Sequence, residues 1–420
     1  MKPRIKQKNM RLLTILFLIF SGIQFSNGQN TVSPYSIFGP GELQNKGFGR
    51  SQAMGGTGIA LRSGSSLNNV NPASYTGIDS LRIITEFGVQ GKLYNLGTSG
   101  KSQTGYTGNF NYLALGFRYN RWLAGSLGVV PFSSVGYSVE KENYIEGLNA
   151  KFTSTYVGSG GISQFYFSNA VKLGKHLSLG LTTSYLFGPL VQDENIGATS
   201  VSPQLLIVRQ DFLRSLYFDY GMQYSFSVKK TEITLGGIFS NRQSLKSKHI
   251  LNVYNESLSL IQGEAYETDY LTVPFTWGLG LGIKNRERYE VLFDYGFQKW
   301  SDVSYPNQFD EFKDAHRFSL GGEFRPWEFR AINKSYKNWV YRVGLNYQTS
   351  YLSFGNSAVT DKSFSLGAGV PLPGRISKFD WSIRMGENGT TTNRLIREKY
   401  VIFQLGFSLN EVAFLKRKFD

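Results

Sequence analysis

Apolar residues alternate with small or polar residues along several stretches of the chain. Between positions 216 and 228 every second residue is apolar, and the intervening residues are mostly small or polar. A period of two is that of a β-strand whose two faces differ in polarity. The stretch exceeds the roughly five or six residues of a soluble strand and is near the ~9–11 residues that cross a bilayer. The alternation recurs in three later stretches: 289–298, 339–348 and 401–409.

The two faces of these strands predict a membrane protein. The apolar faces are rich in aromatic residues, which is typical of a transmembrane barrel with a lipid-facing outside and a polar inside. A soluble β-sandwich also alternates, but 25 Tyr and 32 Phe exceed what one soluble core uses. A sandwich would also have to bury the charges on the polar faces, among them Arg82, Glu86, Arg317, Glu323 and Arg342. We therefore predict an all-β fold, a transmembrane antiparallel β-barrel.

About fourteen strands are expected, joined by alternating short and long connections. In barrels of this class short turns face the periplasm and long loops face outward. An even number of strands places both chain ends in the periplasm. The barrel is expected over 81–409, followed by a periplasmic tail over 410–420. The expected strands are 81–94, 107–119, 122–139, 151–173, 177–188, 213–228, 232–256, 269–284, 288–300, 313–326, 338–351, 362–371, 377–388 and 395–409.

The first residues indicate export. Five basic residues precede an apolar stretch over 12–20, and small residues at Ser26-Asn27-Gly28 suit a signal peptidase. We therefore expect a signal peptide over 1–28. The apolar stretch is shorter than the ~20 residues of a spanning helix. A barrel with such a leader is expected in the outer membrane of a Gram-negative bacterium.

The residue types argue against catalysis. The chain has no cysteine, which excludes disulfides, thiolate metal sites and a lipoprotein anchor. Its three histidines, His176, His249 and His316, fall far apart in the expected topology and suit neither a metal site nor a triad. We expect no enzyme activity, no cofactor and no metal.

The net charge of +15 needs correction for export. The expected leader carries five of the basic residues and no acidic ones, which leaves about +10 on the mature chain. Such a charge suits nucleic acid, but no basic helix or aromatic RNA-binding motif accompanies it. We assign the charge to contact with outer-membrane lipid and lipopolysaccharide and to the lumen, and expect no nucleic-acid partner.

The segment 29–80 precedes the first expected strand and is rich in glycine. Dense glycine indicates tight turns and close backbone approaches. A phosphate-binding loop is excluded because no strand precedes the glycines and no Gly-Lys-Ser/Thr follows them. About fourteen strands enclose more space than wall side chains fill. We expect this segment to be a hatch, a plug in the lumen, with the motif residues Gly47, Gly49, Arg50, Gly55, Gly56, Asn71, Pro72 and Ala73.

This segment resembles the FadL-like outer-membrane long-chain fatty-acid transporters. Their mature N-terminus reads Gly-x-Gly-Arg-Ala, then small residues and Asn-Pro-Ala, and folds as a hatch; here Ser51 replaces the alanine. Later motifs follow the family's order, including Leu271-Thr272-Val273-Pro274 and Trp277-Gly278-Leu279-Gly280. The resemblance spans nearly the whole mature chain. It implies either passage of hydrophobic molecules or a non-transport role in an export or assembly machine, because a fold does not fix a function.

Proline in the third expected strand marks a candidate gate. Proline cannot donate to a β-ladder, so it must lie at a bulge, a kink or an unpaired edge. In the family that the chain resembles, a kinked third strand opens the wall sideways. We map this lateral gate onto Pro131, Phe132, Ser133, Ser134 and Gly136. The alternative is that Pro131 lies above the membrane.

Candidate lumenal ligand contacts are Arg82, Trp300, Arg317 and Arg342. A guanidinium fork pairs well with a carboxylate. The alternative is that these arginines pair with lumenal carboxylates and only satisfy the barrel interior.

Two functions follow. The first is passive uptake of a fatty-acid-like hydrophobic molecule through the outer loops, with hatch rearrangement and lateral exit near the third strand. The second is a structural role, as a subunit or docking platform of an envelope protein complex. An apolar path from the loops to the gate would favour the first, and a lumen blocked by salt bridges the second.

Overall fold

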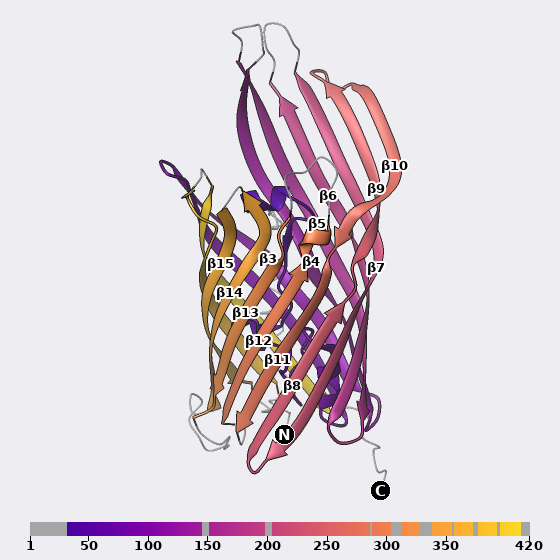
Figure 1. Ribbon diagram of the computed structural model, residues 1–420, viewed down its shortest axis with the longest axis vertical. Helices are drawn as coiled ribbons and strands as arrows, with labels where there is room; N and C mark the ends of the chain where they lie inside the picture. The colour runs from indigo at the N-terminus through magenta and orange to yellow at the C-terminus, as the bar shows by residue number, and fades with distance from the viewer. Residues whose placement is uncertain are drawn as a thin grey trace, which may run out of the picture.

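The computed structural model shows a closed antiparallel β-barrel (Figure 1). It describes residues 32–144, 151–197, 204–285, 288–303, 312–326, 338–354, 357–372, 377–392 and 395–412. Fourteen strands form the wall, as the alternation predicts. They are β2 (Arg82–Gly97), β3 (Ser102–Arg118), β4 (Leu123–Tyr144), β5 (Lys151–Leu173), β6 (Leu177–Ile196), β7 (Leu205–Val228), β8 (Thr231–Ser240), β11 (Phe275–Asn285), β12 (Tyr289–Lys299), β13 (Ala315–Phe324), β14 (Val340–Phe354), β15 (Ser357–Pro371), β16 (Lys378–Asn388) and β17 (Arg397–Val412).

The wall closes where β17 pairs with β2 along its whole length, from Arg397 opposite Gly97 to Val412 opposite Arg82. β17 therefore extends past residue 409, where the sequence placed the end of the barrel. The expected leader and residues 413–420 of the expected tail lie outside the described residues. Among the described residues, no helix is long and apolar enough to cross a membrane.

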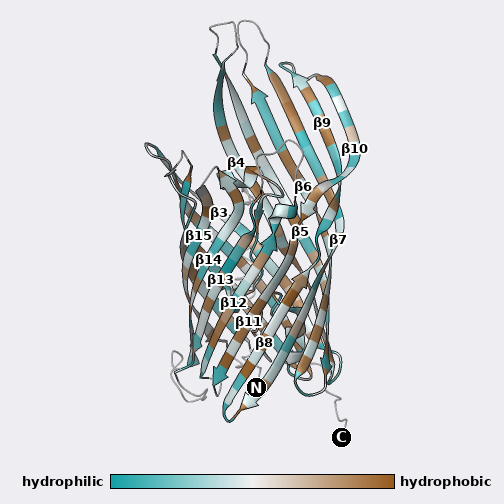
Figure 2. Ribbon diagram, in the orientation of Figure 1, coloured by the Kyte–Doolittle hydropathy of each residue, from teal (hydrophilic) through white to brown (hydrophobic). Residues whose placement is uncertain are grey.

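The side chains of the wall alternate as the sequence predicts. In β12, Phe293 is 45% exposed on the outside, whereas Glu290 and Asp294 are buried on the inside. Figure 2 shows the same alternation of apolar and polar positions along the wall strands. The apolar outer face suits contact with lipid acyl chains, and the lumenal face holds the polar groups.

Two expected strands are each divided into two. The stretch 232–256 forms β8 and β9 (Gln243–Asn255), and 269–284 falls in β10 (Leu260–Val273) and β11. The lower part of β7 pairs with β8 and its upper part pairs with β9. The upper parts of β4 to β7 continue with β9 and β10 beyond the rest of the barrel rim (Figure 1). We call this projecting part the upper sheet.

The N-terminal segment lies inside the barrel (Figure 1). From residue 32 to residue 80 it forms η1 (Pro34–Ile37), β1 (Glu42–Leu43), α2 (Gly49–Gln52) and η2 (Pro72–Gly77), joined by irregular backbone. Most of its residues are buried against the wall. We call these residues the lumenal segment.

Candidate functional site

The lumenal segment fits against glycines of the wall. Gly55 has a φ of +69°, which glycine adopts without strain. Opposite it, a Cβ on Gly344 of β14 would overlap the backbone of Met54 and Gly55. Glycines on both sides of the contact therefore let the two backbones approach more closely than side chains would allow.

Arg50 joins the lumenal segment to the wall. Its Nε donates to Glu323 Oε2 at 2.8 Å, and its Nη2 also pairs with Glu290. Burial alone would lower the pKa of Arg50, but the charges of Glu323 and Glu290 outweigh burial and hold that pKa above its ordinary value. Arg342 donates to the same oxygen of Glu323 at 2.9 Å and pairs with Asp380. We call these five residues the ionic seam.

Asn71 ties the same segment to the opposite wall. Its Nδ2 donates to the carbonyl oxygens of Ile59 at 2.8 Å and of Met222, in β7, at 3.1 Å. Its Oδ1 accepts from Ala73 N at 3.0 Å and caps η2, in which Pro72 takes the first position. Asn71 thus fixes a turn and holds it inside the barrel wall.

The wall is broken between β3 and β4. The ladder joins Leu113–Arg118 of β3 to Ala124–Val129 of β4 and runs no further among the described residues. On its other side, β4 pairs with β5 along its length, with a bulge between Pro131 and Ser133. The break therefore begins next to Pro131, the residue that cannot donate to a ladder.

The lumenal segment covers the β4 edge of this break. Glu42 and Leu43 of β1 pair with Ser134 and Ser133, and Gln44 N donates to Phe132 O at 2.9 Å. Ser33 N donates to Gly136 O at 2.9 Å. Ser133 and Ser134, two residues of the expected lateral gate, are buried under β1.

A cavity of about 180 Å³ lies inside the wall at this point. We call it the central cavity. Val130, Pro131 and Phe132 line it on the side of the break, and the buried side chains of Phe48, Tyr112 and Tyr217 add aromatic surface. Its charged groups are the Lys46–Asp219 ion pair, with Nζ 2.7 Å from Oδ2, and Arg317 and Asp294, and several amide and hydroxyl side chains also line it. The cavity is thus lined by both apolar and charged groups.

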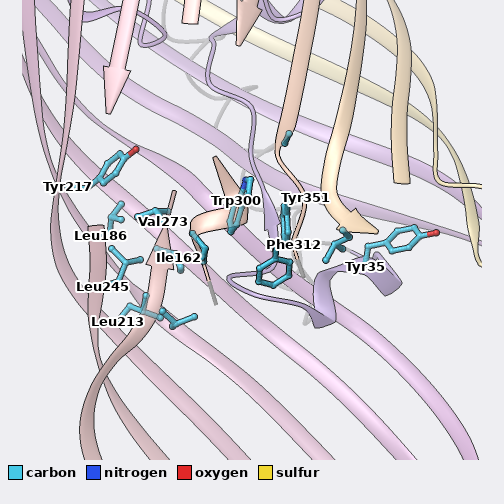
Figure 3. Close-up of a cluster of buried hydrophobic side chains, with 14 of the residues drawn as sticks. Tyr35, Ile162, Leu186, Leu213, Tyr217, Leu245, Val273, Trp300, Phe312 and Tyr351 are labelled. Carbon is cyan, nitrogen blue, oxygen red and sulfur yellow. The ribbon is translucent and has the colours of Figure 1, made fainter. Parts of the chain in front are cut away.

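An apolar cluster, part of which Figure 3 shows, includes Tyr217 and Val273. These two residues and Phe132, which packs against the cluster, also line the central cavity. Trp300, which begins η3 (Trp300–Asp302), is fully buried in this cluster and stacks on Tyr351 with ring centroids 4.1 Å apart. The apolar surface beside the cavity therefore continues into an aromatic layer that spans the lumen.

The four candidate lumenal contacts do not come together. Arg317 lines the central cavity and donates to Asn346 Oδ1 at 3.0 Å, to Asn45 Oδ1 at 3.1 Å and to Gly56 O at 3.2 Å. Trp300 lies within the apolar cluster, and Arg342 belongs to the ionic seam. Arg82 pairs with Asp79 at 3.3 Å near the short turns. Arg82 and Arg342 are therefore paired with carboxylates inside the barrel, which was the alternative to a role in ligand binding.

Sequence reasoning missed Lys46 and Asp219 as partners. They lie in the lumenal segment and in β7, and each one alone reads as a solvated charge. The period of two in β7 places Asp219 on the inward face, and this was the only signal in the sequence that it lies in the lumen. Lys46 lies in an irregular stretch, where no period indicates its direction. Only the fold brings the two together at the cavity.

Residues 8–420 of the chain match the family model of BamG. The chain belongs to the BamG family. No curated protein matches it in sequence. The resemblance to FadL-like transporters holds at the level of the fold.

Solved structures show how widely this BamG-family fold is shared. A FadL homologue from Pseudomonas aeruginosa is 13% identical, with a TM-score of 0.61, and the match covers 90% of this chain and 100% of that one. The Pseudomonas putida toluene transporter TodX is 14% identical, with a TM-score of 0.60 and coverages of 89% and 99%. The Ralstonia pickettii toluene transporter TbuX is 14% identical, with a TM-score of 0.59 and coverages of 88% and 100%. At these identities the likeness establishes the FadL-type barrel fold.

Proposed function

We propose that this BamG-family barrel is an outer-membrane channel for passive uptake of a hydrophobic, fatty-acid-like molecule. The observation that carries the proposal is the central cavity, whose apolar side lies directly against the break between β3 and β4. A ligand chain at Phe132 has lipid on the far side of that break. The structural neighbours described as toluene transporters support passage of hydrophobic compounds through such a fold.

The ligand would enter from the end with the long loops and cross the aromatic layer around Trp300 and Tyr351. Its tail would then lie along Val130 and Phe132 in the central cavity, with an acidic head group near Lys46 and Arg317. Exit along the barrel axis is opposed by the ionic seam, which would leave buried charges unpaired if it opened. Sideways exit is the easier route, since β1 covers the β4 edge with two ladder residues.

In this proposal the lumenal segment is a hatch, and its movement off β4 opens the lateral gate at Pro131–Gly136. The described chain ends at Val412, opposite Arg82, at the end with the short turns, which we assign to the periplasm. Its first residues lie toward the long loops, where Ser33 N donates to Gly136 O and Tyr35 Oη donates to Ile396 O. Outer-membrane lipid and lipopolysaccharide would surround the apolar outer face.

A disulfide that locks β1 onto β4 tests the proposal. Leu43 and Ser133 are ladder partners, and the chain contains no cysteine of its own. We expect the Leu43→Cys, Ser133→Cys double variant to lose uptake of radiolabelled oleate by cells when oxidised and to regain it after reduction. The matched control is Leu113→Cys, Val129→Cys, which bridges a pair already in the β3–β4 ladder. Unchanged oleate uptake in the oxidised test variant would refute lateral exit.

A second candidate function is a subunit or docking platform of an envelope protein complex. The upper sheet favours it, since six strands extend past the barrel rim, where a solute channel does not require them (Figure 1). The family name BamG is compatible with it. Co-purification from native membranes, with and without residues 243–273 of β9 and β10, tests this candidate. A stoichiometric protein partner lost with that hairpin would support it, and purification without a partner would count against it.

A further inference from the structure

A second, larger cavity of about 330 Å³ lies at the end of the barrel with the short turns. We call it the basal cavity. It separates residues 63–65 of the lumenal segment from the wall strands β11 to β16. Six basic and three acidic residues line it, an excess of three positive charges: Arg50, Arg82, Lys284, Arg288, Arg325 and Lys378 against Asp79, Glu290 and Glu323.

The three carboxylates are already paired. Glu290 and Glu323 accept from Arg50, and Asp79 pairs with Arg82. Across the β8–β11 ladder, Lys284 lies opposite Glu232. Lys378 and Arg288 therefore supply positive charge that the carboxylates lining the cavity do not pair.

Lys378 is the most telling of these residues. It begins β16, and its Nζ donates to Ser65 Oγ at 3.2 Å. Within the described part of the chain, no carboxylate lies within 4.0 Å of this ammonium group. A partly buried ammonium with one hydroxyl partner still has donors to offer, because lysine carries three. An anion in the cavity would satisfy them.

We propose that the basal cavity is a binding site for a phosphate group. Lysine binds phosphate as a point charge, and arginine forks bind its oxygens in pairs. A phosphate monoester carries roughly −1.5 to −2 charges, which matches the two positive charges of Lys378 and Arg288 better than a single carboxylate does. The serine hydroxyls of Ser63 and Ser65 add neutral donors on the opposite side. The site is independent of the uptake route, since it lies beyond the ionic seam from the central cavity.

The phosphate group has two possible sources: free inorganic phosphate and the head group of an anionic lipid. Titration of the purified full-length barrel in neutral detergent with inorganic phosphate, at low ionic strength, tests the first. Nanodiscs that contain phosphatidic acid, whose head group is a phosphate monoester, compared with nanodiscs of phosphatidylcholine alone, followed by ³¹P NMR, test the second. Saturable binding of one phosphate group per chain from either source supports the site and assigns its source.

Variants decide whether the basal cavity is responsible. Lys378→Gln and, separately, Arg288→Gln should each weaken phosphate binding at least tenfold. Lys175→Gln, in an exposed turn at the same end of the barrel, is the matched control and should bind like the unmodified protein. Arg288 is exposed, so its variant remains informative if Lys378→Gln does not fold; heat-modifiable gel mobility reports folding. Absence of saturable binding, equal binding by all variants, or binding of an aspartate-rich peptide without phosphate would overturn the proposal.

Discussion

Arg50 and Glu323 meet as a two-bond pair, with Nε 2.8 Å from Oε2 and Nη2 3.0 Å from Oε1. The two residues are 273 positions apart and belong to the lumenal segment and to β13. Both side chains are nearly buried, at 10% and 9% exposure. This pair therefore couples the position of the lumenal segment to the integrity of the wall.

Removing Arg50 should destabilise the protein strongly. Arg50→Gln leaves Glu290 and Glu323 buried as like charges on neighbouring strands, and breaking such a pair costs about 3–5 kcal/mol. The measurement is the free energy of unfolding of the barrel in vesicles, by urea titration. Lys151→Gln is the control, because its pair with Glu142 is exposed and such pairs contribute roughly 0–1 kcal/mol. A loss at Arg50 no greater than at Lys151 would contradict the role given to the seam.

An arginine on the lipid face should cost more than one on the upper sheet. Phe293→Arg places a charge in the apolar band and should reduce stability by about 2–4 kcal/mol near the bilayer midplane. Tyr266→Arg on β10 has a similarly exposed position, at 52% against 45%, but lies beyond the barrel rim. It should change the free energy of unfolding little. Equal losses in vesicles would mean that Phe293 does not face lipid.

Cysteine labelling checks the same register. A cysteine at position 293 should react with lipid-phase reagents, and one at position 294 should not, because Asp294 is buried against the backbone amides of Gly58 and Ile59. The reverse result would place β12 one residue out of register.

A single methyl group should disturb the contact between β14 and the lumenal segment. Gly344→Ala forces a Cβ against the backbone of Met54 and Gly55, which cannot rotate away as a side chain can. Overpacking of this kind costs typically 1–3 kcal/mol. Gly322→Ala is the control, since its Cβ would meet only Val343 Cγ1 at 3.4 Å. Protease sensitivity of residues 45–60 should rise in the first variant and remain unchanged in the second.

The wall break should be visible in hydrogen exchange. Amides of β3 between residues 102 and 112 that point toward β4 have no ladder acceptor there, whereas those that point toward β2 do. Alternating fast and slow exchange is therefore expected over 102–112, and uniform protection over 113–118. Uniformly slow exchange along all of β3 would show that the ladder continues to the outer end.

The sequence predicted the wall well because lipid imposes a period of two wherever a strand is in the bilayer. It was less accurate beyond the bilayer. β6 was expected to end at residue 188 and β7 to begin at 213, yet they extend to Ile196 and back to Leu205. Both faces of the upper sheet are away from lipid, so the alternation of apolar and polar residues is weaker there. The loop expected at 257–268 is largely β10 for the same reason.

The candidate site was predicted only where one residue carries its own constraint. Pro131 marks the bulge because proline lacks an N–H, and it does so in any context. The pairing of Glu42 and Leu43 with β4 could not be predicted in this way, because a strand of two residues is too short to show a period of two. Partners such as Lys46 and Asp219 depend on how the lumenal segment folds across the barrel, which local pattern does not encode.

The glycine contacts of the wall constrain the order in which the molecule is assembled. Gly221, Gly236 and Gly344 receive the backbone or side chains of the lumenal segment from within, at separations that exclude a methyl group. A barrel that sealed β17 to β2 first would have to admit a folded, closely fitting body through its mouth. Residues 32–80 are more readily enclosed while that seam is still open, so the last step of closure and the seating of the lumenal segment would be one cooperative event.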